Sequence, residues 1–219
     1  DLLDEAGASA PALPVDVAGE VLDPYFSRDG HWLLFAAGRA GKLALYRAAV
    51  VADGSMGRAQ PLAGKDGSRA ERGAALSADG RRLLFARDQG RGAGWDLFVA
   101  PLDAQGVRGA AMALTALNTA ADETDGDWLG NDGAVVFSRG NSEAAQVMTS
   151  ACAWTGAALQ PLGLSFNQTG GWTGAPVVDN AKPGEMMVAS SAARAPRAGG
   201  VDVYRLAVPK VAAVAGCVR

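Results

Sequence analysis

The stretch SADGRRLLFAR, residues 77–87, places an Asp-Gly pair directly before a short apolar run. Such a pair favours a tight turn because glycine adopts a positive φ at little cost, and the apolar run is typical of a buried strand. The same pattern occurs as SRDGHWLLFAA, residues 27–37, and in a weaker form as GNDGAVVFSRG, residues 130–140. The sequence therefore repeats a strand, a turn and a second strand.

The turn glycines recur at a nearly constant spacing. Gly30, Gly80, Gly133 and Gly184 are separated by 50, 53 and 51 residues, and Pro183 replaces the aspartate in the last copy. A segment of alternating polar and apolar residues follows each turn, as in a half-buried strand. These segments are KLALYRA, WDLFVAP, AQVMTSA and VDVYRLA. A shorter segment follows in three copies (AQPLAG, AMALTAL and LQPLGL), which indicates a fourth strand.

We therefore predict an all-β fold, a β-propeller of about four blades. Each blade is expected to be a four-stranded antiparallel sheet of roughly 50 residues. A sheet this small can bury both of its faces only by packing against neighbouring sheets, as the blades of a propeller do. The chain of 219 residues is expected to form a single propeller domain. The expected blades are 20–66, 67–118, 119–168 and 169–208. Residues 8–19 or the C-terminal tail would close the last blade, since pairing the chain ends removes an exposed sheet edge.

Charge and hydropathy exclude two kinds of partner. The net charge is −3, from 20 basic and 23 acidic residues, and no basic run suggests nucleic-acid binding. No apolar stretch approaches the roughly 20 residues that cross a bilayer, so we expect no transmembrane segment. The first residues, DLLDEAGASAPALP, contain no initiator Met and fit a trimmed chain or an exported protein after signal removal. Cys152 and Cys217 permit a disulfide without requiring one.

The segments PYFSRDGHWLLF, residues 24–35, and ALSADGRRLLF, residues 75–85, resemble the TolB-type, WD-like propeller repeat. The resemblance extends over residues 20–208, with Arg28 and Ala78 in place of the second proline of that repeat. Similar repeats occur in periplasmic scaffolds of the bacterial envelope, in secreted proteins and in propellers that gate serine peptidases. The resemblance implies a protein that is periplasmic or secreted, its signal peptide removed, and that has a protein or peptide partner.

The sequence lacks the residues that common catalytic devices require. His31 is the only histidine and lies in the turn DGHW, so neither a Ser-His-Asp triad nor a zinc site can be assembled, and we expect no catalytic residue and no cofactor. The alternative to a protein without a cofactor is one that binds a calcium ion. Its candidate is the acidic segment 121–133, although Leu129 stands where a calcium loop needs an oxygen ligand. The acids of that segment are Asp122, Glu123, Asp125, Asp127 and Asp132.

Propellers place ligands at the mouth of the central channel, where the segments that enter the innermost strands converge. Aligning the repeats brings GEVLDP, AERGA, DETDGD and GWTGAP to that rim. The predicted binding residues there are Glu71, Arg72, Glu123, Asp125 and Trp172. An acidic rim with one arginine and one tryptophan suits a cationic or peptide-like ligand, although loops are also polar simply because they are solvated.

Repeat architecture without catalytic residues predicts a non-catalytic propeller of the bacterial envelope, which binds a ligand or serves as a scaffold for a protein partner. Two enzymatic alternatives remain. One is a propeller hydrolase or lyase that uses rim carboxylates and a bound cation. The other is the propeller part of a peptidase.

Overall fold

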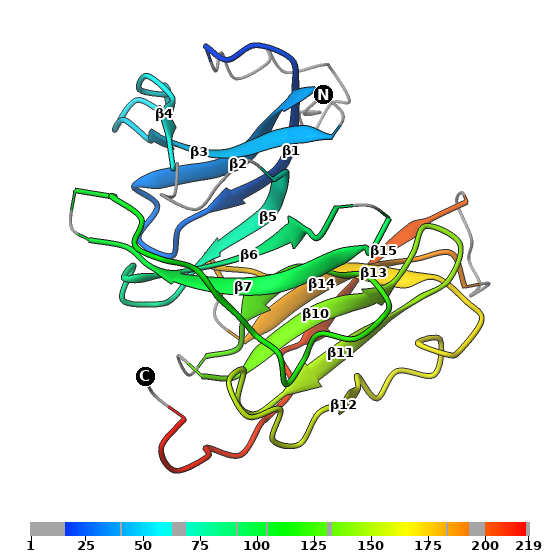
Figure 1. Cartoon of the computed structure of the whole chain (residues 1–219). Helices are drawn as coiled ribbons and strands as arrows, with labels where there is room; N and C mark the ends of the chain where they lie inside the picture. The colour runs from blue at the N-terminus through cyan, green and yellow to red at the C-terminus, as the bar shows by residue number, and fades with distance from the viewer. Residues whose placement is uncertain are drawn as a thin grey trace, which may run out of the picture.

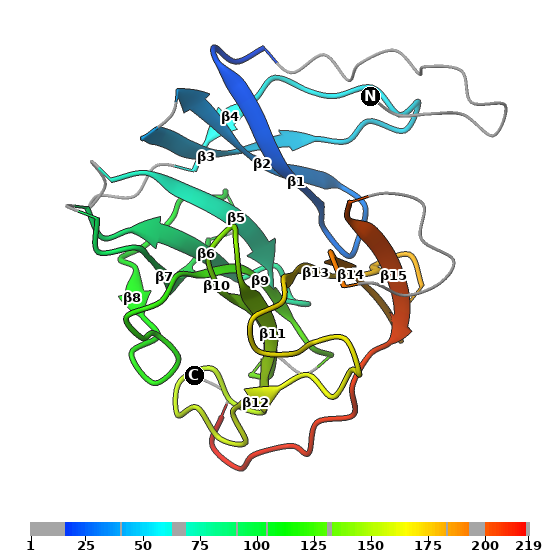
Figure 2. The ribbon, with the colours of Figure 1, turned by 90° about the vertical axis from the view of Figure 1, so that its right-hand side faces the viewer.

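The fold consists of strands arranged as four small sheets around one axis (Figures 1 and 2). A computed structural model describes residues 16–39, 41–62, 69–90, 92–103, 105–130, 133–182, 184–192 and 200–217. In this part of the chain there are fifteen strands and no helix, hence none that could span a bilayer. Each sheet is antiparallel and is built from strands consecutive in sequence. The predicted β-propeller is therefore confirmed.

The strands divide among the blades in chain order. Blade 1 contains β1 (Glu20–Phe26), β2 (Trp32–Arg39), β3 (Lys42–Ala49) and β4 (Gln60–Pro61). Blade 2 contains β5 (Glu71–Leu76), β6 (Arg82–Asp88), β7 (Trp95–Pro101) and β8 (Met112–Ala113). Blade 3 contains β9 (Glu123–Trp128), β10 (Val135–Gly140), β11 (Ala145–Ser150) and β12 (Gln160–Pro161). Blade 4 contains β13 (Thr173–Val178), β14 (Glu185–Ser190) and β15 (Asp202–Ala207).

Blade 4 has three strands among the described residues. Of the two expected closures, the C-terminal tail forms no strand in residues 208–217. Pro209 lacks a backbone N–H for a ladder, and the tail runs from β15 past β12 (red in Figure 2). The other candidate, residues 8–19, lies outside the described residues except for 16–19, which are not in a strand.

The two clearest repeats form the same hydrogen-bonded turn. Ser27 Oγ donates to Asp29 Oδ1 at 2.6 Å, and the backbone N–H of His31 donates to the same oxygen at 3.0 Å. In blade 2, Ser77 and Asp79 reproduce the first of these bonds at 2.6 Å. The aspartates of the Asp-Gly pairs are therefore turn residues, as their side-chain chemistry predicts.

The second strand of each complete blade is buried on both faces. In β2, Leu33 to Ala37 are all at most 5 % exposed, and in β6 Leu83 to Ala86 are fully buried. Such strands are continuously apolar because neighbouring blades cover both of their faces. One hydrophobic core joins blades 1, 2 and 3, and a second joins blades 3 and 4.

The innermost strand of every blade contains one residue in the left-handed region. The φ angles are 53° at Asp23, 61° at Gly73, 51° at Asp125 and 48° at Ala175. Each residue coincides with a shift in the register between the first and second strands, which marks a β-bulge. Asparagine and aspartate tolerate this conformation, whereas alanine does so at a cost.

A disulfide between Cys152 and Cys217 fixes the C-terminal tail to blade 3, across 65 residues of sequence. The tail packs closely there, because a Cβ on Gly133 would overlap the Cys217 side chain. The bond therefore joins the last described residue of the tail to the loop that follows β11.

Replacing both cysteines by alanine should lower the free energy of unfolding by about 2–5 kcal/mol, because the unfolded chain then regains the freedom of a long loop. Urea titration of both proteins, with and without reductant, measures this loss. Reductant should shift the midpoint of the wild type and leave that of the double variant unchanged. Equal urea midpoints for the wild type and the double variant in the absence of reductant would contradict the disulfide.

Ala175→Gly should stabilise the protein by about 1 kcal/mol, since glycine adopts a positive φ without steric cost. In a chain of this length that corresponds to a rise in Tm of about 2–4 °C. Ala74→Gly, in the innermost strand of blade 2, is the control and should lower Tm, because Ala74 is buried and is not among the positive-φ residues. Scanning calorimetry of both variants tests the strain at residue 175.

Candidate functional site

The innermost strands enclose a cavity of about 220 Å³ on the axis of the propeller. Each strand contributes three consecutive residues to its wall. A regular strand would turn every second side chain away, so the bulges explain why consecutive residues face one cavity. The lining residues are Asp23, Pro24, Tyr25, Gly73, Ala74, Ala75, Asp125, Gly126, Asp127, Ala175, Pro176 and Val177.

A charged cluster lies beside this cavity. Arg72 donates two hydrogen bonds to the carboxylate of Asp23, both 3.0 Å long, and the Gly73 N–H donates a third at 3.2 Å. Burial raises the pKa of Asp125, and the charge of Arg72 opposes this effect. Burial also lowers the pKa of Arg72, but the hydrogen bond to Asp23 and the charges of Asp23 and Asp125 leave it raised overall. Two carboxyl groups thus share one guanidinium.

Ser138 extends the cluster toward Trp172. Its hydroxyl donates to Asp125 Oδ2 at 3.1 Å and accepts the Ala175 N–H at 2.9 Å. A Cβ on Gly174 would lie 3.2 Å from both Ser138 Oγ and Trp172 Cζ2, so the indole and the hydroxyl flank the same glycine. We call Asp23, Arg72, Asp125, Ser138 and Trp172 the channel cluster. Of the predicted rim residues, Arg72 and Asp125 interact electrostatically, whereas Trp172 adjoins Ser138 only across Gly174 and also lines a separate cavity with Glu143 and Ser191.

The other two predicted rim residues lie elsewhere. Glu71 is 5 % exposed and accepts hydrogen bonds from Arg87 and Arg108, with shortest distances of 2.7 and 2.6 Å. Glu123 is fully buried and accepts a bond from Arg139 at 2.8 Å. Both glutamates are the first residues of innermost strands, where sequence analysis expected solvated loops. Their carboxylates form buried ion pairs with arginine side chains.

A regularity in the sequence points to these pairs. Arg87 follows Glu71 by 16 residues, and Arg139 follows Glu123 by the same number. Within a strand, turn and strand unit, such a spacing places the two residues opposite each other, as the register of both blades has them. Ser138, in contrast, precedes Arg139 without any motif that would mark it as a channel residue.

Asp127 occupies the contact between blades 3 and 4. It is 2 % exposed, and its Oδ2 accepts the Val178 N–H at 2.8 Å. Burial raises the pKa of Asp127 to about 7, and bonds from Val178, Trp128 and Tyr25 only partly offset this effect. The tyrosine belongs to blade 1 and Val178 to blade 4, so this carboxyl group interacts with residues of both blades.

The carboxylate oxygens of the acidic segment 121–133 accept hydrogen bonds from different parts of the protein. Asp122 Oδ1 accepts the Trp95 N–H at 3.0 Å, and Thr119 and Arg139 occupy the carboxylate of Glu123. Among the residues that the structure describes, no three His, Cys, Asp or Glu side chains are grouped so that they could hold a metal ion. Asp132 lies outside them, and the calcium alternative stays a prediction.

The fold and the cluster define a small β-propeller with a charged, mainly acidic channel. Two solved TolB structures resemble it: a protein assigned as TolB from Agrobacterium tumefaciens (TM-score 0.58, 16 % identity) and TolB from Acinetobacter baumannii (TM-score 0.54, 10 % identity). The matches cover 84 % and 87 % of this chain, and 60 % and 41 % of those chains. At these identities the likeness shows a common fold.

A solved puromycin hydrolase is also similar, with a TM-score of 0.53 and 21 % identity over 86 % of this chain. The match covers 27 % of the hydrolase, so this chain spans between about a quarter and three fifths of the length of these three proteins. No family model and no curated protein matches the sequence.

The raised pKa of Asp127 predicts a loss of stability with rising pH. The folded protein binds this proton up to about pH 7, whereas an unfolded aspartate releases it near pH 4. The stabilising contribution is therefore complete below about pH 4 and is lost as the pH rises to about 7. Between pH 4 and pH 7, the free energy of unfolding of the wild type should fall by about 2–4 kcal/mol relative to that of Asp127→Asn. Urea unfolding of both proteins from pH 4 to pH 8 measures the difference, and parallel curves would refute the shift.

Proposed function

We propose that the protein is a non-catalytic propeller that binds a protein or peptide partner by a cationic group at its channel. The main observation in support of this proposal is the composition of the channel cluster, in which Asp23 and Asp125 share Arg72 beside the cavity of about 220 Å³. A net negative site of this kind attracts ammonium or guanidinium groups. The volume is below the 300 Å³ typical of small pockets for drug-sized ligands, which favours a single inserted side chain.

The bonding of the channel carboxyl groups supports binding over catalysis. Asp125 is held by Thr124 and Ser138, and Asp127 by two backbone N–H groups. Carboxyl groups held by such bonds keep a fixed position, as a surface complementary to a cationic ligand requires. Trp172 lies next to Gly174 of the same strand region, and its indole would be the nearest aromatic partner for a cation.

The proposed location is the bacterial periplasm or, for a secreted protein, the outside of the cell. The Cys152–Cys217 disulfide supports this location, because such bonds persist in oxidising compartments. The similarity to TolB structures agrees with it, since TolB-type repeats occur in scaffolds of the bacterial envelope.

Binding of two pentapeptides tests the proposal: glycine-flanked lysine and the same peptide with norleucine. The lysine peptide should bind more tightly, and Asp125→Asn should weaken it about tenfold. Asp53→Asn is the matched control, because Asp53 lies in an exposed turn of blade 1. Isothermal calorimetry at low and high salt measures the affinities. Equal affinity for both peptides, or equal effects of both substitutions, would refute the proposal.

The similarity to puromycin hydrolase favours a second candidate, the propeller part of a hydrolase. Its catalytic residues would belong to a part of the protein beyond these 219 residues, since His31 is the only histidine here. Assaying the purified chain with aminoacyl p-nitroanilides separates the two ideas. Hydrolysis that Asp125→Asn abolishes would refute the non-catalytic proposal.

A further inference from the structure

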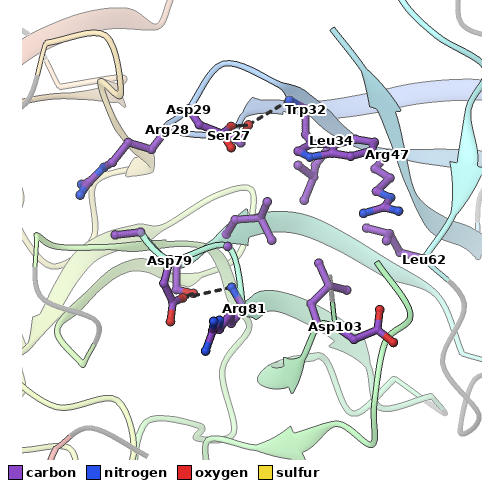
Figure 3. A pocket seen from close by; sticks show the side chains of 15 residues that line it. Ser27, Arg28, Asp29, Trp32, Leu34, Arg47, Leu62, Asp79, Arg81 and Asp103 are labelled. Carbon is purple, nitrogen blue, oxygen red and sulfur yellow. Dashed lines mark hydrogen bonds between the residues drawn. The ribbon is translucent and has the colours of Figure 1, made fainter. Parts of the chain in front are cut away.

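A second cavity, of about 490 Å³, lies between blades 1 and 2, away from the channel (Figure 3). We call it the seam cleft. Its apolar wall consists of Leu34, Leu62, Leu76 and Leu102. Both copies of the Ser-x-Asp-Gly turn line it as well, one from each blade. This volume falls in the range of small-molecule sites, unlike that of the channel cavity.

The equivalent seam between blades 2 and 3 contains large aromatic side chains. Trp128 and Trp154 lie there with ring centroids 6.1 Å apart, and the guanidinium of Arg82 lies 5.6 and 5.5 Å from the two rings. The seam between blades 3 and 4 is covered differently, by the C-terminal tail and Cys217.

The register explains why the first seam is open. Trp128 is the last residue of β9 and pairs with Val135, and Leu76 is the last residue of β5 and pairs with Leu83. Leu76 therefore occupies in the seam cleft the place that Trp128 fills in the next seam. The indole of Trp128 is thus replaced by the smaller side chain of Leu76.

Blade 1 supplies a flat surface for an incoming ring. The guanidinium carbon of Arg47 lies 4.1 Å from the centre of the Trp32 ring. Arg47 also donates to the Gln105 carbonyl of blade 2 and thereby bridges the cleft. A stacked Arg and Trp pair resembles the arrangement in the filled seam, which favours a planar aromatic occupant.

The charges at the cleft favour an anionic group on that occupant. The carboxylates of Asp29, Asp79 and Asp103 all accept hydrogen bonds from groups of their own turns. Within the described part of the chain the guanidinium groups of Arg28 and Arg81 form no hydrogen bond or ion pair, and their charges act only at longer range, that of Arg28 on Asp127 and that of Arg81 on Asp79. Arg28 extends away from the leucines, at the polar end of the cleft (Figure 3). A carboxylate is the natural partner for these groups.

We propose that the seam cleft is a binding site for a planar aromatic group that carries a carboxylate, such as the aromatic C-terminal residue of a peptide. The seam cleft and the channel cavity have no lining residue in common.

Ligand-observed NMR titration with N-acetyl-L-tryptophan and with its neutral amide tests the proposal on the whole chain. The acid should bind saturably, and the amide about threefold more weakly. Leu76→Trp, which copies the filled seam, should weaken binding of the acid at least about tenfold. Val203→Trp is the matched control, because it adds an indole on exposed β15, and should leave the affinity unchanged.

Arg28→Gln/Arg81→Gln keeps the test decisive if Leu76→Trp fails to fold, since both arginines are exposed. This variant should reduce the affinity for the acid to that for the amide. Absence of saturable binding by the wild type, or unchanged affinity of the folded Leu76→Trp protein, would overturn the proposal. The proposal would also be overturned if the arginine variant lost affinity for the acid and for the amide to the same extent. Asp125→Asn should not affect either titration, which separates this site from the channel.

Discussion

The bulge in each innermost strand is the constraint on which the channel depends. Four strands converge on one axis, and each bends at a left-handed residue, so that three consecutive residues line the cavity. The bulge also places Asp23 and Asp125 where their carboxyl groups can share Arg72. Blade 4 has Ala175 at this position and contributes backbone rather than charge. The electrostatic character of the channel thus follows from a backbone irregularity together with the side chains at that position.

Much of the architecture could be predicted from the sequence, because turns and buried strands leave local signals. The spacing of Gly30 and Gly80 indicates the repeat, and Asp29 and Asp79 form the expected turn bonds. The short strands β4, β8 and β12 lie in the three segments assigned to a fourth strand. The path of the C-terminal tail was not predictable, since the Cys152–Cys217 pairing depends on tertiary structure.

The site was only partly predictable, because burial of a charge depends on partners that are distant in sequence. Arg108 lies 37 residues from Glu71, and no local pattern connects them. Both residues are buried, and an isolated buried charge would be costly, so each depends on the other. The composition of the predicted rim therefore combined two groups of residues that the structure separates. The seam cleft left no signal either, since it arises from a smaller side chain at Leu76 than at Trp128.

The attachment of the tail also determines how the protein would respond to mechanical force. Cys217 is bonded to blade 3, although the chain reaches it from β15 of blade 4. A load applied beyond Cys217 therefore passes directly into the loop after β11 and bypasses β15. While the bond is intact, blade 4 lies inside a closed covalent loop and carries none of this tension. Reduction would transfer the load to β15, the outermost described strand of blade 4, and to its pairing with β14.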